Sequence, residues 1–274
     1  MAEDAKIIRL YHYMPAKYAE EFLRKDEIKL CDLTKSNDLC EFSPRVGGLA
    51  EKDLLYRLKF ENHRANFSAR NPMLVLSFSS RVSSSAVWGH YADQNKGICL
   101  VFEFFVENLH EQYGVIMGTI PDISAQFHKV TYTDTRFEIP VSAYMRGDEE
   151  IFSYLCSAIS HKSTDWSYEK EFRLVFYVDE ESRSVIVKDE LFFALGLRKY
   201  LVGVVMGARC QMSDLYLKAV LREVASVNID RNLKKRLSNI KIARAKIDEL
   251  QMNIQALPYK DFIFNPIAKT RLTL

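Results

Sequence analysis

Three long runs of apolar, β-branched and aromatic residues constrain the fold of this chain more than any other feature. Residues 73–79 read MLVLSFS, residues 98–105 read ICLVFEFF, and residues 200–206 read YLVGVVM. A strand with one solvated face alternates apolar and polar residues, whereas continuous apolar runs are typical of strands buried on both faces. Helical patterns lie between these runs. The sequence therefore predicts a mixed α/β (α+β) fold with a central, largely buried sheet and flanking helices.

The other predicted elements follow from local signals. Pro15 ends an aromatic and β-branched run and precedes a stretch with apolar residues at helical spacing. Three serines at 83–85 provide an N-cap for a short helix. The remaining predictions are strand 7–14, helix 16–25, helix 49–67, helix 86–92, a short strand at 130–132, helix 149–162, a strand pair at 166–178 and 183–188, and helix 214–223.

The C-terminal part has a different character. Residues 231–257 contain no glycine or proline, are rich in basic residues, and carry leucine and isoleucine at a spacing of three or four (Leu233, Leu237, Ile240, Ile247 and Ile254). This pattern predicts a long C-terminal helix. We therefore expect one domain over residues 1–228 and a C-terminal helical extension over 229–274, with a short apolar segment at 262–264.

Composition excludes several classes of protein. The chain has 274 residues, 48% of them hydrophobic, and its 38 basic and 36 acidic residues give a net charge of +2. This near-balance gives no general attraction to nucleic acid or anionic lipid. The sequence shows no signal peptide and no run of about 18 apolar residues that could cross a membrane. Its five cysteines are odd in number and widely spaced, which favours reduced thiols and a cytoplasmic location.

The strongest candidate for chemistry is the segment Y-E-K-E-F-R at 168–173. On a strand, side chains two residues apart share a face, so Glu169, Glu171 and Arg173 are expected to point the same way. Two adjacent carboxylates at the end of a buried strand must be solvated, paired with cations or used in catalysis. The structural alternative is an exposed strand end with a simple Glu–Arg ion pair.

Weaker candidates lie on other segments. Ser77 and Ser79 place hydroxyls on one face of the run at 73–79, although buried serines mostly bond to the backbone. His12 lies among aromatic residues of the first strand, where a core position is the commoner explanation. His90 and Asp93 have a spacing that gives only a weak metal signal, and no metal-binding motif is present. No metal site is predicted.

Taken together, several segments resemble a bacterial family catalogued as domain of unknown function 2971. They are Leu10-Tyr11-His12-Tyr13, Asn37-Asp38 with Glu41-Phe42, Ser77-Phe78-Ser79, Trp88-Gly89-His90-Tyr91-Ala92-Asp93, Gly97-Ile98-Cys99-Leu100-Val101-Phe102, and Trp166 to Arg173. The order of elements is also similar, by remote analogy, to ADP-ribosyltransferase folds.

That analogy implies roles for particular residues. ADP-ribosyltransferases carry a polar anchor on the first strand, a serine or tyrosine on a middle strand and an acid, often in an E-x-E pattern, on a later strand. The matching positions are His12 (or Arg9), Ser77 or Ser79, and Glu169-x-Glu171. Glu171 would stabilise the charge that develops when the nicotinamide–ribose bond of NAD breaks, and Glu169 would activate the acceptor. Tyr13 or Tyr91 would stack on nicotinamide.

Three functions are consistent with these patterns. The first is an NAD-consuming ADP-ribosyltransferase or glycohydrolase with NAD as substrate and no tightly bound cofactor. The second is a non-catalytic sensor or partner-binding module of a bacterial stress or phage-defence system, which would self-associate through its C-terminal helix. The third is a metal-dependent nuclease or hydrolase that uses His90, Asp93 and the glutamates. Nucleic acid is not a favoured partner, because the basic stretch lacks interleaved aromatic residues.

Overall fold

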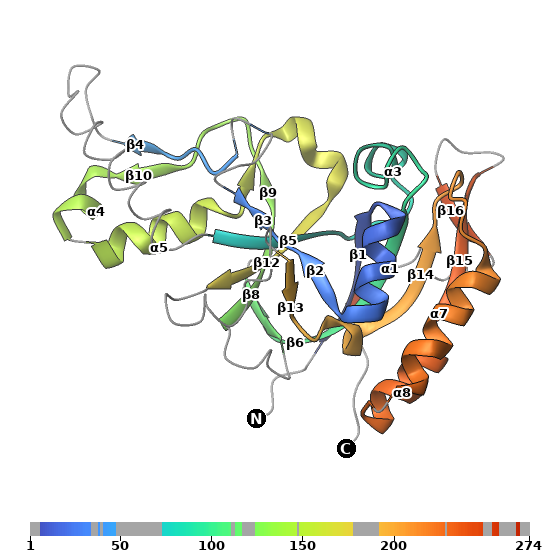
Figure 1. Cartoon of the computed structure of the whole chain (residues 1–274). Coiled ribbons are helices and arrows are strands. Elements are labelled where there is room, and N and C mark those ends of the chain that lie inside the picture. Colours follow the sequence, from blue (N-terminus) through green and yellow to red (C-terminus); the bar gives the residue numbers. More distant parts are fainter. Residues whose placement is uncertain are drawn as a thin grey trace.

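The computed structural model describes most of the chain (Figure 1). The described residues are 6–33, 38, 41–47, 73–110, 113–116, 124–146, 148–177, 192–227, 229–248, 254–257 and 267–268. The predicted helix at 49–67, the predicted strand at 183–188 and the apolar segment at 262–264 lie outside these residues.

Strands and helices alternate irregularly along the chain. The helices are α1 (Ala16–Lys25), α3 (Ser85–Tyr91), α4 (Val141–Arg146), α5 (Asp148–Ala158), α7 (Asp214–Ser226) and α8 (Arg231–Ser238), with 3-10 helices at Thr164–Glu169 and Leu197–Tyr200. The strands of the large sheet are β1 (Lys6–Met14), β3 (Cys31–Asp32), β5 (Met73–Ser79), β6 (Ile98–His110), β7 (Tyr113–Ile116), β8 (Ser124–Lys129), β12 (Glu171–Tyr177), β14 (Leu201–Met206), β15 (Lys241–Ile247), β16 (Ile254–Leu257) and β17 (Ile267–Ala268). Three small two-stranded sheets pair β4 (Arg45–Gly47) with β10 (Glu138–Pro140), β9 (Thr131–Tyr132) with β11 (His161–Lys162), and β2 (Glu27–Lys29) with β13 (Phe192–Ala194).

Within the described residues, six strands of the large sheet pair in a closed circuit. The order is β6, β7, β8, β12, β5 and β1, with β1 pairing back onto β6, and every step is antiparallel. The start of β6 also pairs with β14, and β15 and β16 extend the sheet beyond it. Of these pairings only β14 with β15 is parallel. The predicted mixed α/β class is therefore confirmed, with a mostly antiparallel central sheet.

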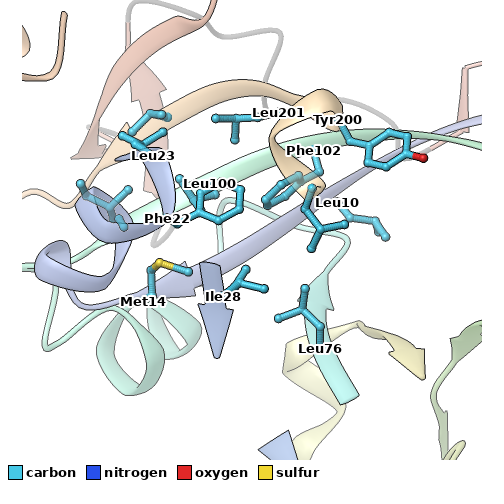
Figure 2. Packing of buried hydrophobic residues seen from close by; sticks show 14 of the residues in the cluster. Leu10, Met14, Phe22, Leu23, Ile28, Leu76, Leu100, Phe102, Tyr200 and Leu201 are labelled. Carbon is cyan, nitrogen blue, oxygen red and sulfur yellow. The ribbon is translucent and has the colours of Figure 1, made fainter. Parts of the chain in front are cut away.

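Both faces of the central strands are buried, as the continuous apolar runs predicted. On one face, Leu76, Phe78, Leu100 and Phe102 join the largest apolar cluster, to which α1, α7 and α8 also contribute. Figure 2 shows Phe22 and Leu23 of α1 close to Leu100 and Leu201 in this cluster. Each fully buried side chain of this size contributes about 1.5–3 kcal/mol of transfer free energy. This cluster supports the sheet from one side, and the polar side chains described below lie on the other face.

The opposite face is covered by two smaller apolar clusters. Trp88 of α3 packs edge-on against Tyr13 of β1, with their ring centroids 5.1 Å apart. Ile151 and Leu155 of α5 pack against Val175 of β12. Between these two clusters the same face carries polar and charged side chains, which form the site described below.

Serine side chains cap the starts of two helices, and the first of these caps was predicted. Ser84 accepts a hydrogen bond from the backbone N–H of Val87 at the start of α3, and Ser213 accepts one from Tyr216 at the start of α7. Each such cap contributes about 1 kcal/mol. The predicted helix at 149–162 is shorter than expected, because α5 ends at Ala158 and His161–Lys162 forms the strand β11.

The predicted long C-terminal helix is wrong. Of the described residues after 230, only Arg231–Ser238 is helical, and Lys241–Ile247 is a strand that pairs in parallel with β14. In this strand Ile242, Ala243 and Ala245 are buried, whereas Ile247, which fitted the helical spacing, is 78% exposed. Pairing with the backbone of β14 outweighs the helix propensity of the basic residues, because tertiary hydrogen bonds and burial stabilise a segment more than propensity does. None of the helices among the described residues is long and apolar enough to span a bilayer.

Candidate functional site

A cavity of about 230 Å³ lies where β1 and β5 separate from each other. These two strands share a single residue pair, Tyr11 with Ser79, whereas β1 pairs along its whole length with β6. The cavity lining contains all the residues that the sequence selected as primary candidates, namely His12, Tyr13, Ser77, Ser79, Tyr91, Glu169 and Glu171. The structure thus brings these residues together, and their roles stay predictions.

Glu169 reaches the cavity by a different route from the one predicted. The strand expected to start at Trp166 starts at Glu171, and Glu169 is the last residue of a 3-10 helix. Lys170 between them has a left-handed backbone (φ 48°), which turns the chain sharply. The two carboxylates therefore face one site because of this turn, and the prediction that they share a strand face is wrong.

Three carboxylates and two cations form a buried ionic cluster at the cavity wall. We define this cluster as Glu41, Lys162, Glu169, Glu171 and Arg173. The side chains are between 1% and 7% exposed. With all groups ionised the cluster has three negative and two positive charges, a net charge of −1. Buried charges of this kind are tolerated only when each has close partners of opposite sign.

The cations of the cluster each contact more than one carboxylate. Lys162 Nζ lies 2.7 Å from Oε2 of Glu169 and 3.3 Å from Oε2 of Glu171. Arg173 donates to both carboxylate oxygens of Glu171 at 2.9 and 3.0 Å, to the carbonyl oxygen of Ile159 at 2.6 Å, and to Glu41. The guanidinium is thus held in a bidentate pair, the strongest common geometry for an ion pair.

The two neighbouring glutamates have opposite pKa shifts. Burial disfavours the charge of Glu171, but Arg173 and Lys162 outweigh it and lower the pKa of this carboxyl to about 2. Burial raises the pKa of Glu169, repulsion from Glu171 adds to this, and the nearby Lys162 opposes it. Glu171 is therefore a fixed anion at neutral pH, and Glu169 keeps its proton to a higher pH than Glu171 does. Such a divergence between adjacent carboxyls is typical of acid–base sites.

Tyr91 holds Glu169 from the side opposite Lys162. Its hydroxyl donates to Oε1 of Glu169 at 2.5 Å. Burial and this hydrogen bond raise the pKa of Tyr91, so the phenol stays protonated and remains a donor. Glu169 thus has one oxygen bound to Tyr91 and the other to Lys162, which fixes its orientation in the cavity.

His12 presents an acceptor to the cavity. Its Nδ1 lies 2.7 Å from the carbonyl oxygen of Ser77. A carbonyl can only accept, so Nδ1 carries the proton and Nε2 has a lone pair. Burial lowers the pKa of His12 to about 4, against the effect of this hydrogen bond, so the ring is neutral at pH 7. Any ligand group that meets Nε2 must therefore donate a hydrogen bond.

The other predicted residues are held in the framework of the site. The hydroxyl of Ser79 donates to the backbone oxygen of Glu169 at 2.6 Å, and that of Tyr13 donates to the backbone oxygen of Arg81 at 2.8 Å. A hydrogen bond from the Ser77 side chain is one of the effects that lower the pKa of Glu171. Arg9, the alternative first-strand anchor, pairs with Glu103 at 2.6 Å and is not among the residues that line the cavity.

Two members of the cluster were missed or underrated from sequence. Lys162 was placed in a helix, and it lies instead on the short strand β11. Glu41 belonged to a segment quoted for its family resemblance, but no local pattern connected it with Arg173, which is 132 residues away. Lysine and glutamate are common on solvated surfaces, so sequence offered no signal that these two are buried.

The segment around His90 and Asp93 has a structural explanation. Asp93, Gln94 and Asn95 form a left-handed turn, and the backbone N–H of Gly97 closes it on Ala92 at 2.8 Å. A Cβ at Gly97 would lie 2.3 Å from the carbonyl oxygen of Met14, so glycine is required for this close approach. Among the residues that the structure describes, no group of three or more His, Cys, Asp or Glu side chains could hold a metal ion.

Fold and site together define a mixed α/β protein with a mostly antiparallel sheet and a charged cavity at the start of β12. Residues 87–174 match the model of a family described as protein of unknown function (DUF2971), which confirms the predicted resemblance over that part of the chain. This range begins within α3 and ends within β12. No curated protein and no solved structure matched the chain. The ADP-ribosyltransferase analogy therefore rests on the element order and on the site residues alone.

Proposed function

We propose that the cavity binds the nicotinamide–ribose part of NAD and that the protein cleaves the bond between them. The observation that carries this proposal is the pair of carboxyls in one cavity wall, of which Glu171 is a fixed anion and Glu169 has a raised pKa. Cleavage of an N-glycosidic bond needs both functions, an anion beside the developing positive charge and a base for the incoming acceptor.

The chemistry places each group in a definite role. The bond between ribose C1′ and the pyridinium nitrogen breaks, and its electron pair goes to that nitrogen, so nicotinamide leaves neutral. Positive charge develops at C1′ and the ring oxygen, where the net negative charge of the ionic cluster stabilises it. A water molecule adds to C1′, and Glu169 takes its proton. ADP-ribose, nicotinamide and one proton are the products when water is the acceptor.

The cavity size and its donors and acceptors are consistent with this substrate. A volume of about 230 Å³ is below the roughly 300–1,000 Å³ of pockets that hold drug-sized ligands. We therefore expect one ribose and the nicotinamide ring inside and the rest of NAD outside. Nε2 of His12 would accept a hydrogen bond from a ribose hydroxyl, and the ring of Tyr91, which is 37% exposed, would contact nicotinamide.

The first experiment measures nicotinamide release from NAD by chromatography. We expect Glu169→Gln to reduce the rate by about 100-fold or more, because a general base typically contributes 10²–10⁴-fold. Glu103→Gln is the matched control, since Glu103 pairs with Arg9 and is not among the residues lining the cavity. Circular dichroism melting verifies that each variant is folded. The proposal fails if the wild-type protein releases no nicotinamide between about pH 5 and 9 and calorimetry detects no NAD binding.

A second variant tests the assignment of Glu169 itself. The hydrogen bond from Tyr91 lowers the pKa of Glu169, so Tyr91→Phe should raise that pKa. The acidic limb of the pH–rate profile should then move to higher pH, because the base is ionised only above its pKa. An unshifted limb would mean that another group is the base.

A further inference from the structure

A second concave region lies far from the charged cavity, between helices α7 and α8. This groove has a volume of about 520 Å³. Its floor is apolar and includes Leu221 of α7, Leu237 of α8 and Ile242 of β15, which are 6%, 1% and 7% exposed. In Figure 1 the two helices lie at the end of the molecule next to β14 and β15, away from α4 and α5.

The rim of the groove carries cations without carboxylates. Lys218 and Arg222 lie one turn apart on α7, and Lys234 lies on α8, and all three are exposed. Among the described residues, the lining contains no aspartate or glutamate. Within the described part of the chain, none of the three side chains makes a hydrogen bond or ion pair. Glu223, the neighbour of Arg222 in sequence, instead pairs with Arg24 of α1 at 2.7 Å.

Repulsion between these cations slightly raises the free energy of the unoccupied surface. Binding of an anionic partner is therefore favoured. Like charges one turn apart on a helix destabilise it by a few tenths of a kcal/mol. A partner that supplies carboxylates would remove this repulsion and gain ion pairs at the rim. At the same time its apolar side chains would cover the floor. The cationic rim and the apolar floor together therefore favour a partner that carries both carboxylates and apolar side chains.

We propose that the groove between α7 and α8 docks an acidic amphipathic helix of a partner protein. Aliphatic side chains of that helix would lie on Leu221, Leu237 and Ile242, and its glutamates or aspartates would meet Lys218, Arg222 and Lys234. This is the common mode in which a helix binds an apolar groove through residues on one face.

Two other anionic partners fit less well. Single-stranded nucleic acid needs aromatic side chains on which bases stack, and the lining has none. A lipid surface needs protruding apolar side chains that enter the headgroup region, whereas the floor residues are recessed between the helices. The combination of recessed aliphatic floor and cationic rim favours a protein helix.

The test uses a fluorescein-labelled helical peptide of about 20 residues, with leucines on one face and glutamates beside them. Fluorescence anisotropy measures its binding to the full chain. We expect saturable binding that weakens with salt, and a loss of about tenfold or more in the double variant Lys218→Glu/Arg222→Glu. Lys96→Glu, an exposed position outside the groove, is the matched control and should bind as the wild type does.

Methyl NMR gives a second measurement at residue level. The methyl signals of Leu221, Leu237 and Ile242 should shift on titration with the glutamate peptide, while those of Leu174 and Val175 of β12 stay in place. The proposal is overturned if a peptide with lysine in place of glutamate binds equally well, or if no saturable binding occurs up to ~1 mM. It is also overturned if single-stranded RNA or phosphatidylserine vesicles bind more tightly, or if light scattering shows a dimer that the double variant dissociates.

Discussion

The charged cavity and the groove between α7 and α8 use the same kinds of cation in opposite ways. In the ionic cluster at the cavity, Lys162 and Arg173 are buried and both pair with carboxylates. In the groove, Lys218, Arg222 and Lys234 are exposed and the lining offers them no carboxylate. The difference follows from desolvation, because a buried cation without a partner costs several kcal/mol and an exposed one costs almost nothing.

This contrast separates two kinds of functional surface. The cavity is already neutralised almost completely, so a ligand there meets fixed groups and a small net charge. The groove has unsatisfied charge that a partner can use. We therefore expect substitutions in the cavity to change both stability and chemistry, and substitutions in the groove to change binding alone.

The largest expected effect is the loss of Arg173. Arg173→Met removes the guanidinium that pairs with the buried Glu171 and Glu41, and should lower the free energy of unfolding by about 3–5 kcal/mol. Urea denaturation measures this. The control is Arg9→Met, whose ion pair with Glu103 is 23% and 27% exposed and should contribute less than about 1 kcal/mol.

If Arg173→Met does not fold, Arg173→Lys is measured instead. This variant retains the charge but loses the bidentate contact, so its free energy of unfolding should fall by less than is expected for Arg173→Met. A loss of under about 1 kcal/mol for Arg173→Met would show that the cluster is hydrated and that the contrast with the groove is wrong.

The second-largest effect is the loss of stability that Glu171 contributes as the pH falls. The pKa of Glu171 is lowered from 4.5 to about 2 in the folded protein, so its contribution to stability is fully present above pH 4.5 and is lost as the pH falls towards 2. A shift of this size corresponds to about 3 kcal/mol. The stability difference between the wild type and Glu171→Gln should therefore shrink over that interval. Urea titrations at about pH 6, 4.5 and 2.5 measure it, and a constant difference would contradict the assignment.

The smallest effect is expected in the groove. The double substitution Lys218→Gln/Arg222→Gln should change the free energy of unfolding by no more than about 0.5 kcal/mol, and in the stabilising direction, because it removes a repulsive pair one turn apart. Thermal melting at low and high salt provides the measurement. A fall in the free energy of unfolding by more than about 1 kcal/mol would mean that these cations have structural partners. The groove would then not be a surface reserved for a binding partner.

The sequence predicted the elements that depend on local chemistry. The strand before Pro15, α1 with its observed bounds, and β5 are confirmed, as is the serine cap of α3. In these segments the side-chain pattern and the backbone preference agree, so no long-range contact was needed to decide them. The segment after Ser238 was predicted wrongly, because the helical spacing of its isoleucines is a local signal and pairing with β14 decides the outcome.

The candidate site shows the same division. Glu169, Glu171, His12 and Tyr91 were selected from short motifs, and these residues do line one cavity. The reason given for the two glutamates was wrong, since a left-handed Lys170 and not a shared strand face turns both inward. Lys162 and Glu41 could not be selected, because their burial depends on segments that are distant in the sequence.

By itself the sequence determined which segments are buried strands, where several helices begin, and which residue types are available for chemistry. These properties depend on the spacing of apolar residues and on capping groups within a few positions of each other. Only the tertiary structure decided that five charged side chains form one buried cluster, four of them lining a cavity, that the two glutamates have opposite pKa shifts, and that three cations surround an apolar groove. Burial, charge compensation and ionisation depend on neighbours in space, and those neighbours come from strands and loops that are far apart along the chain.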